Sequence, residues 1–428
     1  MYAPHANCPL LTFAAPHMNA PLNKNSSQIH QIFAFIIPFA VGFGIYFWMI
    51  PVFLIALAWQ YFKNDEAPFF HAGKRLGFEA QFLVFFMILG LFLGCYRGIY
   101  IPYHPQIYAL PGRYFTILLA ITLGVSLWIL SFRNNRQCIQ FVWCFCLGTL
   151  LFSLLTIGTS LALEPTPYYG RLVNILTPKV FSARSYINSP GISNLLCFFP
   201  IAFMAGLLLK PGQRPWGFWV LGILGFALSL GSALVINQRS YFVVTLLMAP
   251  ILVGLFLVIQ RAWHTLAWVL IPLACYPTLW LANSLLPNSP WTRFLNGDIM
   301  NDARFQMLSY WFSHLIKDPF TRIEVGPAQW QDLQWFHNFF ADVHRFSGFW
   351  SLATALLLFG FIFYRLILLI RTNQNMGLFL TAIAIPIFLI MNTSVVPEGE
   401  RQPFFLLIFI GVICEKLLAF HKKNLVST

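Results

Sequence analysis

Apolar runs as long as a bilayer crossing, about 20 residues, recur from end to end of this chain. Of its 428 residues, 58% are hydrophobic and only 9% are charged, and the mean hydropathy is +0.71. In lipid, backbone polar groups must bond within the protein, so only helices and closed barrels cross a bilayer. The runs are continuous and do not alternate, which excludes a barrel. The sequence therefore predicts an all-α integral membrane protein and excludes a water-soluble enzyme.

About twelve transmembrane helices are predicted from the length of these runs. The first run, Ile32 to Phe62, is too long for one crossing, and Gly42, Gly44 and Pro51 divide it into two short helices. The other spans are expected at 77–95, 114–131, 139–163, 191–209, 217–236, 241–260, 263–283, 347–370, 377–396 and 402–419. The chain then divides into a polar cytoplasmic tail (1–30), the first set of helices (31–283), a large loop with short helices (284–346), and the last helices with a short tail (347–428).

Basic residues in short loops orient such a chain, because they stay on the cytoplasmic side. With both termini inside, the inner loops hold Lys63, Lys74, Arg75, Arg133, Arg136, Lys210, Arg214, Arg261, Arg371, Lys422 and Lys423. A second group of cations, mostly arginines, falls on the outer side: Arg97, Arg113, Arg171, Lys179, Arg184, Arg239, Arg293, Arg304, Lys317, Arg322, Arg345 and Arg401. Guanidinium groups suit bidentate phosphate contacts, so we expect an external anionic ligand. Pairing with outer carboxylates or lipid headgroups is the alternative.

Arg239 stands in the short polar break "NQRS" between two apolar spans. A charge so close to hydrocarbon is costly, so we expect it to face a partner or an aqueous cavity. The alternative is an ordinary turn arginine whose side chain reaches out to the interface.

The loop at 284–346 is long for a connection, and long loops often carry function. Within it, "DARFQMLSYWFSHLI" has helical apolar spacing, with Arg304 in the first turn and Pro319 just beyond the end. The apolar positions of this helix would lie on the membrane surface or cover the bundle, and they are Phe305, Leu308, Trp311, Phe312 and Leu315. Arg304 could equally belong to its solvated face.

The end of this loop reads "QWFHNFFADVHRFSG" and carries two histidines. A helix entering the membrane from His337 puts His344 on roughly its own face, and Asn338, Asp342 and Arg345 on an adjacent one. Neutral imidazole accepts protons near pH 7, and nearby arginines favour its neutral form. His337 is therefore a candidate general base, and His344 is a rival on identical grounds. The alternative for either is a histidine bonded to a headgroup or carbonyl at the interface.

Taken in this order, these features resemble the O-antigen ligase and polymerase superfamily of bacterial envelope glycosyltransferases, over most of the chain. The ligases carry a histidine, then Asn, Ser or Gln, nine residues and a glycine, and His337, Asn338 and Gly348 fit that pattern. Ser351 stands where a second glycine often follows. "NQRS" resembles the family's arginine after a Ser-rich helix end, and "YINSPGISNLL" resembles its entry to a middle helix. The loop's Arg304, Trp311 and Gly326 resemble its loop motif.

This resemblance implies transfer of a glycan from undecaprenyl diphosphate to a sugar hydroxyl of lipid A–core, at the periplasmic face of the bacterial inner membrane. It implies an inverting reaction without metal or other cofactor, whose partners are the glycan donor, the acceptor and membrane lipids, with no nucleic acid. The implied catalytic residues are His337, Arg239 and Arg304. The candidates for binding substrate are Arg171, Arg184, Arg401, Arg345, Asn338 and His344.

Three other functions stay open at this stage. O-antigen polymerases and protein O-oligosaccharyltransferases share these motifs loosely, but the spacing from His337 to Gly348 favours a ligase over a polymerase. A secondary transporter or flippase would also have many helices and few charges. It should show internal repeats and mid-membrane carboxylates, whereas no repeat is visible and Glu79 is the main candidate carboxylate.

Overall fold

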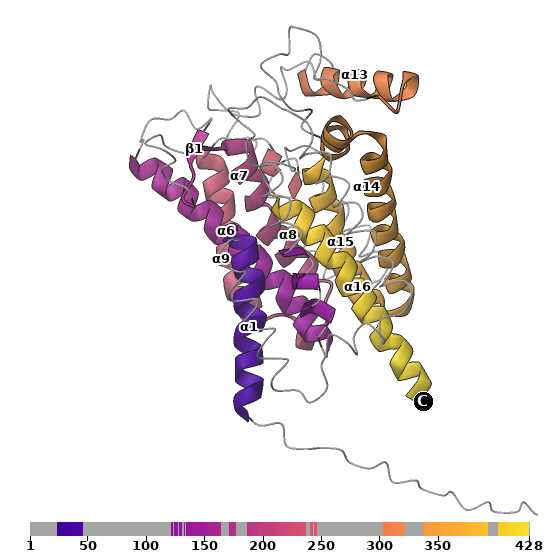
Figure 1. Cartoon of the computed structure of the whole chain (residues 1–428). Coiled ribbons are helices and arrows are strands. Elements are labelled where there is room, and N and C mark those ends of the chain that lie inside the picture. Colours follow the sequence, from indigo (N-terminus) through magenta and orange to yellow (C-terminus); the bar gives the residue numbers. More distant parts are fainter. Residues whose placement is uncertain are drawn as a thin grey trace, which may run out of the picture.

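The computed structural model describes residues 24–45, most of 121–130, 132, 134–163, 171–176, 186–236, most of 240–245, 303–321, 336, 338–392 and 401–427. Within these ranges the chain is a bundle of helices with one small sheet (Figure 1). The helices are α1 (Lys24–Phe43), α6 (Asn135–Leu163), α7 (Ser189–Leu196), α8 (Phe198–Gly206), η1 (Pro211–Gln213), α9 (Phe218–Val235), α13 (Ala303–Lys317), α14 (Phe339–Thr372), α15 (Gln374–Met391) and α16 (Gln402–Ser427). The sheet pairs β1 (Arg171–Val173) antiparallel with β2 (Tyr186–Asn188).

Six helical segments of the described chain are long and apolar enough to cross a membrane. They cover 135–163, 189–206, 218–235, 348–372, 374–391 and 402–421, and α7 and α8 together make the second of them. The sequence predicted a span at each of these positions, so a helical chain with several candidate membrane spans is confirmed. The predicted spans at 77–95, 241–260 and 263–283 lie wholly or mostly outside the described residues.

The first helix differs from its prediction at one end. Helix α1 begins at Lys24, inside the predicted polar tail, and it ends at Phe43, followed by Gly44 at φ 91°. The break expected around Gly44 is thus confirmed. A β-carbon on Gly42 would lie 2.0 Å from the carbonyl oxygen of Phe145 in α6. One on Gly148 would lie 2.1 Å from the carbonyl oxygen of Phe39. These two glycines therefore let the backbones of α1 and α6 touch.

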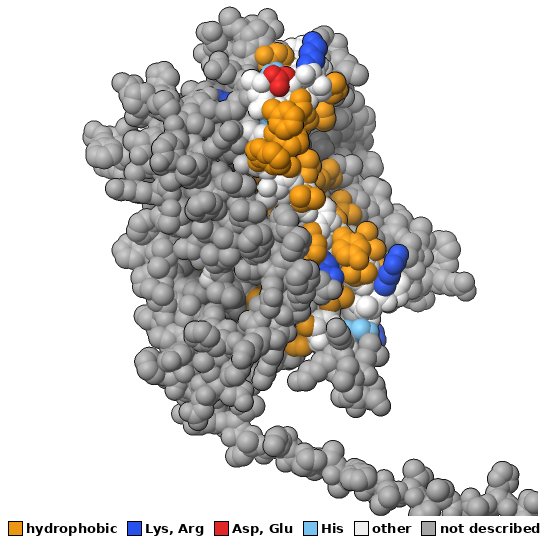
Figure 2. Space-filling view, turned by 45° about the vertical axis from the view of Figure 1, so that its right-hand side comes forward, with side chains coloured by type: hydrophobic (Ala, Val, Ile, Leu, Met, Phe, Trp, Pro, Cys, Tyr) orange, Lys and Arg blue, Asp and Glu red, His pale blue; other side chains and the backbone are white. Residues whose placement is uncertain are grey.

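Helix α14 keeps one side free of other described helices. Figure 2 shows mostly hydrophobic side chains running down the described part of this face. The exposed apolar residues of α14 are Trp350, Leu356, Leu357, Tyr364 and Ile367. So long an apolar surface is unusual for a water-soluble protein, and it suits a helix that faces lipid.

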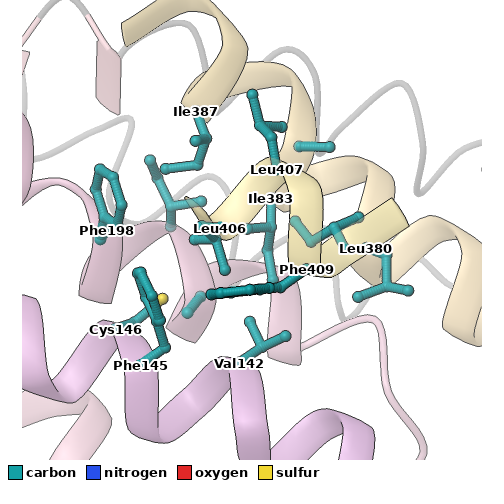
Figure 3. Close-up of a cluster of buried hydrophobic side chains, with 14 of the residues drawn as sticks. Val142, Phe145, Cys146, Phe198, Leu380, Ile383, Ile387, Leu406, Leu407 and Phe409 are labelled. Carbon is teal, nitrogen blue, oxygen red and sulfur yellow. The ribbon is translucent and has the colours of Figure 1, made fainter. Parts of the chain in front are cut away.

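The centre of the bundle is built where α6, α8, α15 and α16 meet (Figure 3). Phe145 and Phe409 pack edge to face with ring centroids 6.3 Å apart, and Phe198, Ile383 and Leu406 fill the space around them. All five side chains are fully buried. Since this core is closely packed, it holds the ends of the same helices in fixed positions for the site described next.

Candidate functional site

The predicted site residues fall into three groups. Nothing is described of His337, Arg239 or Arg184. Arg171 and Arg304 belong to β1 and α13, but their side chains lie outside the described part. The side chains of Asn338, His344, Arg345 and Arg401 are described. The site is therefore built from these four and from the residues that flank the others in the chain.

Asn338 caps the first turn of α14 and ties it to α15. Its side-chain oxygen accepts from the backbone N–H groups of Phe340 and Ala341, each at 3.1 Å. This is the usual arrangement for an asparagine at a helix N-terminus. Its side-chain nitrogen donates to the carbonyl oxygen of Asn392, at 3.2 Å, just beyond the end of α15. The residue after His337 is thereby anchored to a second helix.

The first turn of α16 meets the same point. The ring of Phe339 stacks on that of Phe404, with centroids 5.6 Å apart and planes 28° from parallel. Arg401 immediately precedes α16, and its carbonyl oxygen accepts from the N–H of Phe405. The start of α14, the end of α15 and the start of α16 therefore converge at Asn338 and Phe339, and Arg401 stands one helical turn from Phe404.

Asp342 lies in the first turn of α14 and is fully buried. Its Oδ1 accepts from the backbone N–H of Phe336 at 2.9 Å. Burial raises the pKa of this carboxyl from 3.8 to about 7, although the Phe336 N–H and the guanidinium of Arg345 both act to lower that pKa. Arg345 is itself almost fully buried one turn further on. The predicted placement of Asp342 and Arg345 next to each other is confirmed.

His344 is held between α13 and the residues that follow it. The indole Nε1–H of Trp311 donates to His344 Nδ1 at 3.2 Å, and His344 Nε2 lies 2.9 Å from the carbonyl oxygen of Pro319. An indole nitrogen can only donate and a carbonyl can only accept, so Nδ1 must lack a proton and Nε2 must carry one. Burial lowers the pKa of His344, the hydrogen bond to the Pro319 carbonyl partly opposes this, and the nearby His314 lowers the pKa further. His344 is therefore neutral with both ring nitrogens occupied, which argues against it as the base.

This pairing predicts how Trp311→Phe alters the stability of the chain. Because the folded-state pKa of His344 lies below its ordinary value of 6.5, the unfolded chain takes up a proton first as pH falls, and the wild type loses stability below about pH 6.5. Without the indole donor, Nδ1 can be protonated in the folded chain. Trp311→Phe should therefore lose less stability than the wild type as the pH falls below about 6.5. The substitution should also cost about 1 kcal/mol at neutral pH.

The measurement is the Tm of detergent-purified protein between about pH 5 and about pH 7. Asp342 contributes the opposite trend, since its raised pKa makes stability fall as pH rises from 3.8 to about 7. That contribution is common to both proteins and cancels in their difference. Trp350→Phe, at an exposed tryptophan of α14, is the matched control. A Trp311→Phe protein with an unchanged pH slope would contradict the assigned tautomer.

Helix α13 covers the start of α14. Its predicted end before Pro319 is confirmed, since the helix runs from Ala303 to Lys317. The buried side chains of Met307 and Trp311 pack against Phe336 and against Ala341 and Leu352 of α14. Phe312 is exposed and does not join this contact. The cluster fixes α13, and with it the backbone that carries Arg304, over the residues that flank His337.

The residues that follow Arg239 are held by α7. Ser193 Oγ accepts from Ser240 Oγ at 2.9 Å and from the backbone N–H of Tyr241 at 3.1 Å. The hydroxyl of Tyr241 also lies 2.8 Å from Ser229 Oγ in α9. Ser193 of α7 therefore fixes Ser240 and Tyr241, the two residues that follow Arg239.

Arg171 lies at the entry to α7. In the small sheet Arg171 is paired with Asn188, the residue immediately before α7. The N–H of Val173 donates to Ser160 Oγ at 2.8 Å, which attaches β1 to the last turns of α6. In Figure 1, β1, the start of α7, α13 and the start of α14 all lie at the same end of the bundle. The structure thus gathers at one end the backbones of Arg171 and Arg304 and the residues flanking Arg239 and His337.

Comparison with known proteins adds no further constraint on this site. No family model matches the chain, and no curated protein is significantly similar to it. Among the described residues, no group of three or more His, Cys, Asp or Glu side chains could hold a metal ion.

One charged pair was missed by the sequence analysis. Glu79, the carboxylate singled out there, lies outside the described residues. Glu415 lies within α16 and forms a buried two-point ion pair with Arg365 of α14, in which Nη2 donates to Oε2 at 2.9 Å and Nε donates to Oε1. The sequence did contain a signal for this pair, because Arg365 and Glu415 are opposite charges within two apolar spans. Each lies in the half of its helix that is farther from the site.

Proposed function

We propose that this chain is a membrane glycosyltransferase similar to the O-antigen ligases. In this proposal it transfers a glycan from undecaprenyl diphosphate to a sugar hydroxyl of lipid A–core. The large loop at 284–346 then lies in the periplasm, about twelve helices cross the inner membrane, and the reaction takes place on the periplasmic face.

The observation that carries the proposal is the convergence of candidate residues at one end of the bundle. Segments far apart in the sequence meet there: β1 with the start of α7, α13, and the adjoining ends of α14, α15 and α16. Each of the predicted arginines 171, 304, 345 and 401 belongs to or adjoins one of these segments. Such a set of cations on one side suits a ligand with several phosphate oxygens.

The chemistry assigns a role to each group. Arg239 and Arg304 hold the diphosphate and stabilise the charge that develops on the leaving group. His337 takes the proton of the acceptor hydroxyl. The acceptor oxygen then bonds to the anomeric carbon as the bond to the diphosphate oxygen breaks, with inversion, and undecaprenyl diphosphate leaves. Arg171, Arg184 and Arg401 serve as further phosphate or sugar contacts, and Asn338 fixes the start of the helix beside the base. Arg345, the remaining candidate, is buried beside Asp342 and takes no substrate contact in this scheme.

The tautomer of His344 supports His337 as the base. The two histidines were equal candidates by sequence, but both ring nitrogens of His344 are occupied by Trp311 and Pro319. A base must have an unoccupied nitrogen within reach of the substrate. His337, placed between the anchored residues Phe336 and Asn338, therefore receives the role.

A secondary transporter is the competing class, and the Arg365–Glu415 pair is the observation that favours it. Ionisable residues inside a membrane often mark a transport pathway. Here, however, the two side chains bond each other at two points between α14 and α16. The pairing accounts for both charges without a pathway, so the transporter remains the second candidate.

A deletion strain tests the proposal directly. We expect loss of this chain to leave carrier-linked polymer intact and lipid A–core bare, as judged by gel profiles of extracted glycolipids, and a plasmid copy to restore the wild-type profile. Lipid A–core capped with a single repeat would assign the chain as a polymerase instead. Loss of glycan from envelope proteins alone would assign it as a protein O-oligosaccharyltransferase. Unchanged glycolipids and glycoproteins would reject glycosyl transfer and favour transport.

A further inference from the structure

The turn that joins α8 to α9 carries two cations far from any carboxylate in the sequence. It reads "KPGQRPWGFW" and holds Lys210 and Arg214. Between Glu164 and Asp298 the chain has no Asp or Glu. Within the described part of the chain, neither cation forms an ion pair. The candidate span made by α7 and α8 separates this turn from the candidate site, so the proposed reaction does not use these charges.

The guanidinium of Arg214 is held by two aromatic rings. Its Cζ lies 5.3 Å from the ring centroid of Phe218 and 5.1 Å from that of Trp219. The two rings stand at 74° to each other with centroids 5.2 Å apart, so they form a corner around the cation. Phe218 is itself buried and packs against Trp143 of α6. Stacking of this kind fixes an arginine without occupying its N–H donors.

Arg214 therefore keeps donors for a ligand. A guanidinium has five N–H donors and no acceptor, and the Nε of Arg214 is buried without a hydrogen-bond partner among the described residues. Burial also lowers the pKa of Arg214, which means that these surroundings disfavour its charge. An anion against the terminal nitrogens would offset this cost. A phosphate group suits them best, because its oxygens match two parallel N–H groups.

A lipid-facing surface begins at the same corner. The exposed large apolar residues of α9 are Trp219, Val220, Ile223, Leu224, Leu228, Leu234 and Val235. Trp219 thus belongs both to the corner around Arg214 and to this surface. Trp216, in the turn itself, is 67% exposed, and tryptophan is enriched where a helix leaves the hydrocarbon. A molecule whose acyl chains lay along α9 would bring its headgroup to Arg214.

We propose that Arg214 and Lys210 bind the phosphate group of an anionic phospholipid whose acyl chains lie along the exposed face of α9. The stacked guanidinium gives the contact its direction, and Lys210, exposed at the start of the same turn, adds a second positive charge. In the predicted orientation this turn is cytoplasmic, and the anionic lipids of that leaflet attract cations beside a span. The inference does not depend on the proposed glycosyl transfer.

Lipid retention by the purified chain tests this site. The protein is incubated with equimolar phosphatidylglycerol and phosphatidylcholine of identical acyl chains, and bound lipids are counted by native mass spectrometry. The wild type should prefer phosphatidylglycerol by about fivefold or more, and Arg214→Gln should lose about that factor, as expected for one cation at an anionic surface. Arg214→Lys should lie between them, because an ammonium keeps the charge but offers no parallel N–H pair.

The matched control is Arg371→Gln, which removes the same charge from an exposed arginine in the last turn of α14. It should lower retention of phosphatidylglycerol by less than about twofold, since an exposed charge interacts weakly. Equal losses in Arg371→Gln and Arg214→Gln would reduce the effect to general surface charge and overturn the site. Equal retention of the two lipids by the wild type, a result that needs no variant, would also overturn it.

Thermal unfolding distinguishes a lipid from free phosphate. Phosphatidylglycerol should raise the Tm of the detergent-purified wild type by a few degrees over phosphatidylcholine, because a ligand of the folded state stabilises it. Inorganic phosphate at the same concentration should leave the Tm unchanged. Arg214→Gln should show no gain from phosphatidylglycerol, and its Tm without lipid gives its own folded baseline. An equal gain from inorganic phosphate would reject a phospholipid as the ligand.

Discussion

Glu415→Ala is expected to destabilise the helical bundle by about 3–5 kcal/mol, the loss typical of removing one partner of a buried ion pair. Arg365 and Glu415 are each less than a tenth exposed and bond each other at two points between α14 and α16. Without the carboxylate, a guanidinium would stay buried in an apolar span with its strongest partner gone. The loss should appear as a lower Tm, or as unfolding at a lower denaturant concentration, in detergent-purified protein.

The double variant Arg365→Met with Glu415→Leu is the matched comparison. Because it removes both charges and keeps much of the side-chain volume, it should be close to the wild type in stability or above it. Arg371→Ala, at an exposed arginine in the last turn of α14, should change stability by about 0.5 kcal/mol at most. A double variant as unstable as Glu415→Ala would show that the cost of Glu415→Ala does not come from leaving the Arg365 charge unpaired. Equal effects of Glu415→Ala and Arg371→Ala would show that the pair contributes nothing special.

The membrane-spanning helices could be predicted because their signal is local. A run of apolar residues as long as a bilayer crossing has few alternatives to a helix, whatever its neighbours. The predicted spans at 139–163 and 402–419 accordingly match α6 and the apolar part of α16. Gly348 had been singled out through the resemblance, as the glycine of the ligase motif that begins at His337. It takes φ 75° and ψ −170°, a conformation open to glycine alone, where α14 turns from the loop into the span.

The partners of each helix could not be predicted in the same way. Helix α14 is apolar around its whole circumference in the span, so periodicity does not indicate which side meets α16. The bonding of Arg365 to Glu415 depends on that choice. His337 and His344 were likewise indistinguishable, because the decisive contact comes from Trp311, which lies on a separate helix earlier in the chain. Such pairings follow from tertiary packing and not from composition.

His337→Ala is expected to lower glycan transfer, in liposomes reconstituted with undecaprenyl-diphosphate-linked glycan and lipid A–core, by about 10² to 10⁴-fold, the range typical of a lost general base. Since the proposed role of this imidazole is to take the acceptor proton in the transition state, the loss should fall on kcat, and KM for the carrier-linked donor should change little. The Tm should change by only a few degrees, because Phe336 and Asn338 keep their anchors to Asp342 and Asn392.

The matched control for His337→Ala is His344→Asn, which keeps a polar group able to accept a hydrogen bond from Trp311. Because His344 is bonded at both nitrogens and neutral in the folded chain, its replacement should lower the Tm and keep kcat within about tenfold of the wild type. If the two variants lost activity equally at equal folded fraction, proton transfer could not be assigned to His337 alone. If His337→Ala transferred glycan at the wild-type rate, the base would have to be another group, and the arginines at this end of the bundle would need a different ligand.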